Sequence, residues 1–237
     1  MTLLFADVEG STRLLEQLGD GYEEVHRHHR RILREQLQEA GGQEIDTQGD
    51  AFFFSFSRAK DAVAGAVSAQ RALADHSWPN GIEVKVRMGL HTGEPTVAEE
   101  GYLGLDVVRA ARICSAGSGG QILLSETTRA LIGNSVPEGV QVRDLGRANL
   151  KDIQHERIFE LSLVERHEAF PPLKVSSSDE AADDLAAQIK EKVNQQILAG
   201  FESGGAPTKL AIFGLLNLIL LVAAIVVIVL IVKWALF

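Results

Sequence analysis

Two short segments each place a carboxylate beside small residues, an arrangement that can bring the carboxylate close to a charged ligand. Residues 5–12, FADVEGST, carry Asp7 at the end of an apolar run and just before a turn of small residues. Residues 46–53, DTQGDAFF, carry Asp50 at a tight turn, where Gly49 allows the backbone to reverse. Taken singly, Asp7 could cap its turn, and the second segment could mark only a hairpin.

A third segment carries cations that could meet a phosphate. In residues 102–113, YLGLDVVRAARI, Arg109 and Arg112 lie three apart on a predicted helix that starts just after Gly104. Residues three apart project from neighbouring positions on a helix surface without coinciding. We therefore expect one of the two arginines to reach a phosphate and the other to face solvent.

These segments lie within an alternating series of predicted strands and helices. Apolar residues recur at three- and four-residue steps in the helices, and they alternate or run continuously in the strands. The expected elements, in chain order, are a strand at 3–8, helices after Thr12 and over 22–40, strands at 43–48 and 51–57, a helix at 58–75 and a strand at 82–92. Further elements are expected at 105–116 (helix), 121–124 (strand), from Ser125 (short helix), and near 140–144 and 157–163 (strands).

The order β-α-β-β-α-β predicts an α+β domain of the ferredoxin-like type, with an antiparallel sheet that carries both helices on one face. In that topology the first and third strands are central neighbours. The end of the first strand and the turn before the third can therefore come close. Asp7 and Asp50 would then meet beside the N-terminus of a helix, where free backbone amides favour Mg²⁺ together with phosphate oxygens.

Through four motifs in order, residues 2–163 resemble the catalytic domain of class III nucleotidyl cyclases, the adenylate/guanylate cyclase family. FADVEGST resembles the first metal segment, in which Asp7 matches the first metal-binding Asp, and TQGDAFFFSF resembles the hairpin segment, in which Asp50 matches the second. GLDVVRAARI resembles a Gly-x-x-Val-Asn-x-Ala-x-Arg helix, whose transition-state Arg matches Arg112. LKDI at 150–153 resembles the late Leu-Lys-Gly segment, whose triphosphate-binding lysine matches Lys151.

The resemblance implies a two-metal reaction in which the ribose 3′-hydroxyl attacks the α-phosphate and pyrophosphate leaves. It places two Mg²⁺ (or Mn²⁺) ions at Asp7, Asp50 and Val8, and divides each site across a homodimer. The aspartates come from one subunit, and Arg112 and Lys151 come from the other. The residues implied around the nucleoside triphosphate are Val8, Glu9, Gly10, Ser11, Thr12, Asp46, Gly49, Val108 and Lys151.

Three positions depart from the family pattern. Asp46 stands where the family has its base-selecting lysine, Gly101 at the second base-selecting position, and Val108 where an Asn positions the ribose. Asp cannot donate to the purine as Lys does, and loss of one such contact typically costs about 10²–10³ in rate. Either the base is read by other means and need not be adenine, or activity is weak and regulated. Asp46 could also be a plain exposed strand residue.

Net charge and cysteine content exclude several kinds of partner and site. The formal net charge of −9 argues against a general affinity for nucleic acid or acidic lipid. The single cysteine, Cys114, excludes an intramolecular disulfide and any CxxC metal site. We expect it to be a small packing residue rather than a nucleophile.

The C-terminal part predicts attachment to a membrane. Residues 210–232 contain no charged side chain, and as a helix they would cross a hydrocarbon core of about 30 Å. The alternative is a buried core helix. Before this span we expect a linker at 164–178, an amphipathic helical stalk at 179–202 that pairs with its twin or lies on the membrane, and a hinge at 203–209. The expected location is a single-pass C-terminal anchor with a cytoplasmic catalytic domain at 1–163.

Two functional hypotheses follow. The first is a membrane-tethered cyclase that makes a 3′,5′-cyclic nucleotide, with ATP as the expected substrate. The second is a degenerate cyclase homology domain that acts as a dimerising or nucleotide-sensing signalling module. Intact Asp7, Asp50, Arg112 and Lys151 favour the first hypothesis, whereas Asp46 and Val108 favour the second.

Overall fold

The computed structural model describes residues 1–98, 101–166 and 169–174, all of which fall in one unit of the chain. The predicted stalk at 179–202, the hinge at 203–209 and the span at 210–232 lie outside the described residues, as does the end of the predicted linker. Within the described ranges, no helix has the length and apolar character needed to span a membrane. The anchor therefore stays a prediction from sequence.

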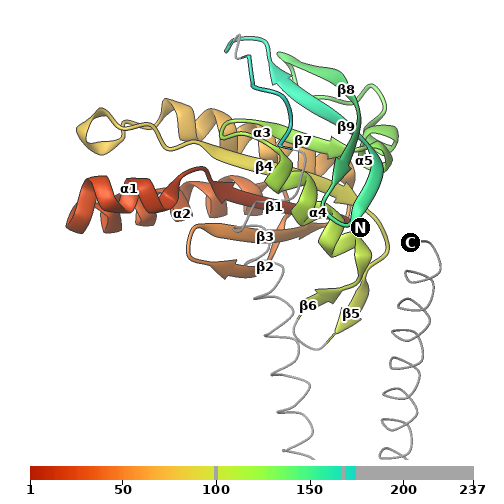
Figure 1. Ribbon diagram of the computed structural model, residues 1–237, viewed down its shortest axis with the longest axis horizontal. Coiled ribbons are helices and arrows are strands. Elements are labelled where there is room, and N and C mark those ends of the chain that lie inside the picture. The colour runs from red at the N-terminus through yellow and green to blue at the C-terminus, as the bar shows by residue number, and fades with distance from the viewer. Residues whose placement is uncertain (99–100, 167–168, 175–237) are drawn as a thin grey trace, which may run out of the picture. The chain divides into compact units, whose positions relative to one another are not determined.

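The described chain forms an α+β domain built on one large sheet (Figure 1). Its strands are β1 Thr2–Val8, β2 Gln43–Gln48, β3 Ala51–Phe56, β4 Val86–Thr92, β5 Thr96–Ala98, β6 Gly101–Leu103, β7 Ile122–Ser125, β8 Val140–Leu150 and β9 Ile153–Leu163. Its helices are α1 Ser11–Leu18, α2 Tyr22–Glu39, α3 Ala59–Asp75, α4 Leu105–Ala116 and α5 Glu126–Ile132, with short 3₁₀ turns at Gly19–Gly21 and Pro79–Gly81.

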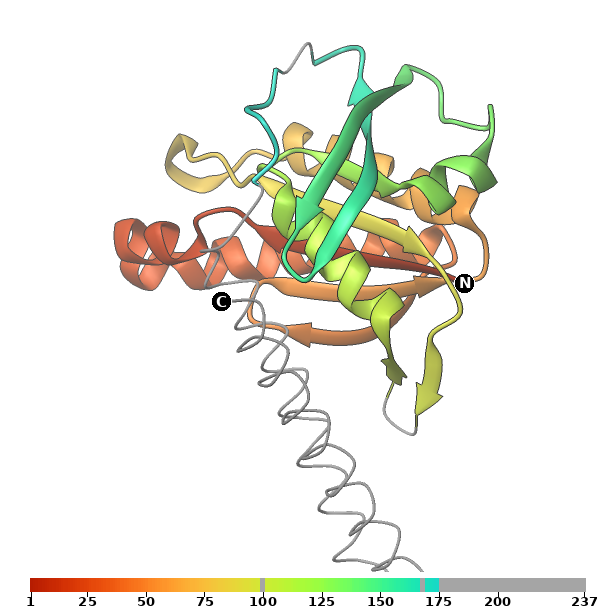
Figure 2. The same ribbon diagram turned by 45° about the vertical axis from the view of Figure 1, so that its right-hand side comes forward.

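The sheet runs β2-β3-β1-β4-β7-β9-β8, so β1 lies between β3 and β4 as the predicted topology requires. Its pairs are antiparallel except for β4 with β7. Residues Leu3 to Ala6 are buried without alternation because the strand is covered on both faces. Apolar side chains of α2 and α3 pack on one face of the sheet, and α4 crosses the other face (Figure 2).

Close packing of α4 on β4 requires a residue without a side chain. A Cβ atom placed on Gly89 would come within 2.2 Å of the backbone nitrogen of Cys114. Cys114 itself is buried, and burial raises the pKa of its thiol to about 12. The predicted packing role of this cysteine is confirmed, since a neutral thiol is a poor nucleophile.

The structure differs from the predicted elements in three places. Residues 82–85 are not a strand, because the paired register of β1 and β4 ends at Val8 and Val86, with one more backbone hydrogen bond from the Glu9 amide to the Lys85 carbonyl. The hairpin of β5 and β6 was not expected, since each strand has only three residues. Strands β8 and β9 are 11 residues each, longer than the apolar pattern indicated, because much of their length is polar and exposed.

A buried histidine on α2 predicts an acid sensitivity of the fold. His29 is packed edge-on against Phe52, and burial lowers the pKa of its imidazole to about 3. Below pH 6.5 the imidazole of His29 is protonated in the unfolded chain but stays neutral in the folded chain. The free energy of unfolding therefore falls as the pH falls. We expect His29 to cost about 2 kcal/mol of unfolding free energy between pH 7 and pH 5.

Urea unfolding of the wild type and of His29→Leu at both pH values measures this cost. The variant should lose much less stability on acidification than the wild type. Equal losses in the two proteins would contradict the assignment to His29.

Candidate active site

The register of the sheet brings the two predicted carboxylates to one edge. Asp7 is the next-to-last residue of β1, and Asp50 lies in the two-residue turn between β2 and β3. Ala6 pairs with Phe52, so Asp7 lies beside the first residues after the turn. Burial raises the pKa of Asp7, the charge of Arg87 opposes this, and the charge of Asp50 raises the pKa further. The two carboxylates are therefore close enough to repel each other.

The carboxylate of Asp50 fits a cation. Its Oδ2 is buried and has no hydrogen-bond partner among the described residues. A buried charged oxygen without a partner is costly, and a bound divalent ion would offset that cost. The described residues hold no cluster of three or more His, Cys, Asp or Glu side chains arranged around a metal position. An ion at this pair would thus need phosphate, water or main-chain oxygens to complete its coordination.

Sequence reasoning missed Arg87, the partner of Asp7. The guanidinium of Arg87 donates to Oδ2 of Asp7 from Nε at 2.9 Å and from Nη2 at 2.7 Å. It also donates to the carbonyl of Ser115 near the end of α4. The available signal was a charged residue between two buried ones, Val86 and Met88, in a central strand. Arg87 orients Asp7 and compensates part of the cost of burying its charge.

Tyr22 and His26, on one face of α2, also border the pair. Burial raises the pKa of the Tyr22 phenol, and the charges of Asp50 and Asp7 raise it further. His26 Nε2 lies 2.8 Å from the carbonyl oxygen of Gly49 in the turn. Their spacing of four residues is the sequence signal that could have found them.

The turn after Asp7 has the backbone expected of a helix start. Gly10 has φ +72° and precedes α1, and no side chain caps the helix. Amides at Ser11 and Thr12 therefore lie in the first turn, where an anion can bind. Glu9 points to other partners: its carboxylate accepts a hydrogen bond from the Gly119 amide and one from Lys174.

The two positions that depart from the base-selecting pattern are neighbours. A Cβ atom on Gly101 would come within 3.1 Å of Ile45, the residue before Asp46. Asp46 lies at an irregularity of β2, where its carboxylate accepts hydrogen bonds from the Thr47 amide and the Gln48 side chain. The side chain is partly buried, so the interpretation of Asp46 as a plain exposed strand residue is wrong.

Arg112 and Lys151 form a second group. Arg112 is 6% exposed on α4, and its Nη2 lies 3.2 Å from Oδ2 of Asp152, the residue after Lys151 in the turn between β8 and β9. Asp152 has φ +61°, a conformation that glycine adopts more readily. Arg109 does not simply face solvent as expected; it pairs with Asp106 and Glu156.

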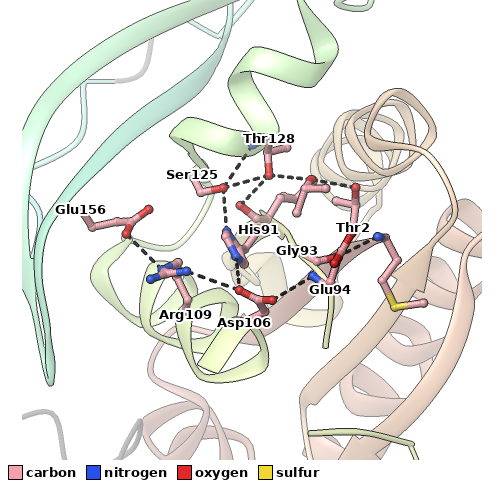
Figure 3. Close-up of polar contacts among 12 residues, drawn as sticks. Thr2, His91, Gly93, Glu94, Asp106, Arg109, Ser125, Thr128 and Glu156 are labelled. Carbon is pink, nitrogen blue, oxygen red and sulfur yellow. Dashed lines mark hydrogen bonds and ion pairs between the residues drawn. The ribbon is translucent and has the colours of Figure 1, made fainter. Parts of the chain in front are cut away.

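A buried network fixes the first turn of α4, the helix that carries Val108 and Arg112 (Figure 3). His91 on β4 has Nε2 3.0 Å from Asp106 Oδ1 and Nδ1 2.9 Å from Ser125 Oγ. Burial lowers the pKa of His91, so the ring is held neutral. The trio superficially resembles a hydrolase triad, but Ser125 is fully buried and caps α5. The trio instead ties the first turn of α4 to β4 and to the start of α5.

Comparisons with known proteins agree with this geometry. A family model described as "Adenylate and Guanylate cyclase catalytic domain" matches residues 1–162. An uncharacterized protein of Mycobacterium tuberculosis is 35% identical over 182 residues, which make up 75% of this chain and 61% of that protein. An adenylate cyclase of Mycosarcoma maydis is 36% identical over 151 residues, 53% of this chain and 6% of that protein. The chain thus corresponds to only part of each relative's length.

Solved structures support the fold. An adenylate cyclase of Trypanosoma brucei, described in its monomeric state, superimposes with a TM-score of 0.68 at 23% identity. The match covers 74% of this chain and 94% of that one. At this identity the likeness concerns the fold alone.

Proposed function

We propose that this chain, which belongs to the adenylate and guanylate cyclase catalytic domain family, converts a nucleoside triphosphate to a 3′,5′-cyclic nucleotide and pyrophosphate. ATP is the expected substrate. The observation that carries the proposal is the pair formed by Asp7 and Asp50, in which a buried carboxylate oxygen has no hydrogen-bond partner among the residues that the structure describes. Class III cyclase domains generally use divalent ions, and this pair fits one.

Each residue of the pair has a defined task in the proposed reaction. Asp7 and Asp50, with the main chain of Val8, would hold Mg²⁺ or Mn²⁺, which supplies charge neutralisation at the α-phosphate and lowers the pKa of the 3′-hydroxyl. Arg87 keeps Asp7 oriented through two hydrogen bonds. The amides that follow Gly10 would bind the terminal phosphates at the start of α1.

Arg112 and Lys151 would supply positive charge to the triphosphate from the partner subunit of a homodimer. Family members act as dimers, and Arg112 on α4 pairs with Asp152, which places it beside the β8–β9 turn that carries Lys151. Attachment to a membrane through residues 210–232, with the catalytic domain in the cytoplasm, remains part of the proposal.

The competing candidate is a cyclase homology domain with little or no activity. Asp46, Gly101 and Val108 favour it, because none of them offers the hydrogen bonds that the family pattern places there. Incubating the full chain with each of the four common ribonucleoside triphosphates, with Mg²⁺ or Mn²⁺, and identifying any cyclic product tests both class and base. A dimeric protein that makes no product from any of the four would exclude the proposed reaction.

Val108 provides a gain-of-function prediction. The side chain is partly buried on α4, where the family places an Asn that positions the ribose. Val108→Asn should raise kcat by up to about 10²–10³, since one placed polar contact in a transition state is worth about that much. Leu105→Asn, on an exposed residue of the same helix, should leave kcat unchanged. Equal kcat values for wild type and Val108→Asn would show that this chain positions the ribose by other means.

A further inference from the structure

The stretch 169–174, here called the return segment, comes back to the domain after β9 and lies beyond the residues that the family model matches. Figure 2 shows the coloured end of the chain running back toward α4. The backbone amide of Lys174 donates to the carbonyl of Ala116, the last residue of α4, at 2.9 Å. Leu173 packs against an apolar cluster that includes Ile113 and Ala116. The return segment is thus docked on the helix that carries Arg112.

The side chain of Lys174 reaches the turn after β1. Its Nζ lies 2.5 Å from Oε1 of Glu9, a contact between residues 165 positions apart. The other carboxylate oxygen of Glu9 accepts from the Gly119 amide at 3.0 Å. A Cβ atom on Gly119 would come within 3.0 Å of the Glu9 side chain and 2.5 Å of Lys85, so this close approach depends on glycine.

Glu9 would be unfavourable to substrate without these partners. It lies two residues after Asp7 and immediately before Gly10, where the triphosphate is proposed to bind. An uncompensated carboxylate there would repel the phosphates. The hydrogen bonds from Lys174 and from the Gly119 amide supply that compensation. Lys174 also contributes, after Arg87, to the positive charge felt by Asp7.

We propose that Lys174 is a positioning residue that neutralises Glu9 and turns it away from the phosphate turn, so that the docking of the return segment sets the affinity for the nucleoside triphosphate. This inference rests on the proposed function.

The test compares KM and kcat in the full chain. Lys174→Gln should raise KM for the metal–triphosphate about two- to fivefold and leave kcat within about twofold, the range expected for a partly exposed ion pair. In a Glu9→Gln background the same substitution should change KM little, because no charge is left to compensate. Uniform damage to the fold would lower kcat in both backgrounds instead.

A matched control is an ion pair that joins α3 to the residues just after β9. Arg71 pairs with Glu165 at 2.8 Å, and the side chains are 37% and 46% exposed, close to 36% and 38% for Lys174 and Glu9. Arg71→Gln should therefore leave KM unchanged. A KM for Lys174→Gln equal to that of wild type, or an equal rise in Arg71→Gln, would overturn the inference.

A binding measurement separates this inference from the proposed reaction. The Kd of a non-hydrolysable ATP analogue with Mn²⁺, measured by calorimetry, should rise in Lys174→Gln by the same factor as KM. If the wild type makes no product but the Kd of the analogue rises in Lys174→Gln, the proposed reaction fails and the role of Lys174 stands. A Kd that is unchanged in Lys174→Gln refutes that role whether or not the wild type is active.

Discussion

Asp50→Asn is expected to lower kcat for cyclic nucleotide formation by at least about 10³, with KM and folding much less affected. The substitution keeps the shape of the side chain but removes the charge that would hold a divalent ion beside Asp7. The buried Oδ2 of Asp50 has no hydrogen-bond partner among the described residues, so no contact of that atom within the described residues is lost with the charge. Product formation at saturating Mg²⁺ and Mn²⁺ measures the effect.

Thermal unfolding gives a second, independent reading of the same substitution. Mn²⁺ should raise the Tm of the wild type, because a ligand that binds only the folded state stabilises it by mass action. In Asp50→Asn this rise should be lost, while the Tm without metal stays the same or increases. Asp20→Asn, on an exposed turn, serves as the control for removal of one acidic charge. Activity within tenfold of wild type in Asp50→Asn would remove the basis of the metal site.

The parts of the site that sequence predicted are those set by local pattern. The continuous apolar run predicted β1, and the turn at Gly49 predicted the hairpin of β2 and β3. The pairing of β1 with β3 follows from the topology. The bounds of α4, Leu105–Ala116, agree with the prediction because Gly104 and Gly117 flank the periodic residues. The approach of Asp7 and Asp50 at one edge of the sheet could therefore be predicted from the sequence.

The contacts that sequence missed join residues whose partners lie far along the chain. Arg87 and Asp7 are 80 residues apart, and His91 meets Ser125 34 residues later. Neither pair leaves a periodic signal in the sequence, because a single side-chain contact does not recur along a helix or strand. A hydrophobic pattern likewise says nothing about the hydroxyl of Tyr22, whose pKa the charges of Asp50 and Asp7 raise.

Two inactive variants are expected to restore activity when combined. Arg112→Met keeps the apolar stem of a buried side chain and removes its charge, and alone it should lower kcat by about 10²–10³. If each site takes its aspartates from one subunit and Arg112 from the other, a dimer of Asp50→Asn with Arg112→Met contains one intact site. Random pairing at equal amounts then gives about a quarter of wild-type activity.

Co-expression of the two variants with different affinity tags, followed by purification through both tags, isolates the mixed dimer. This species should show about half of wild-type activity, since one of its two sites is complete. If Asp50 and Arg112 instead served the same subunit, each subunit of the mixed dimer would carry one defect and no activity would return. The measurement thus decides between a shared and a self-contained site, and it does so without any assumption about the base that the enzyme accepts.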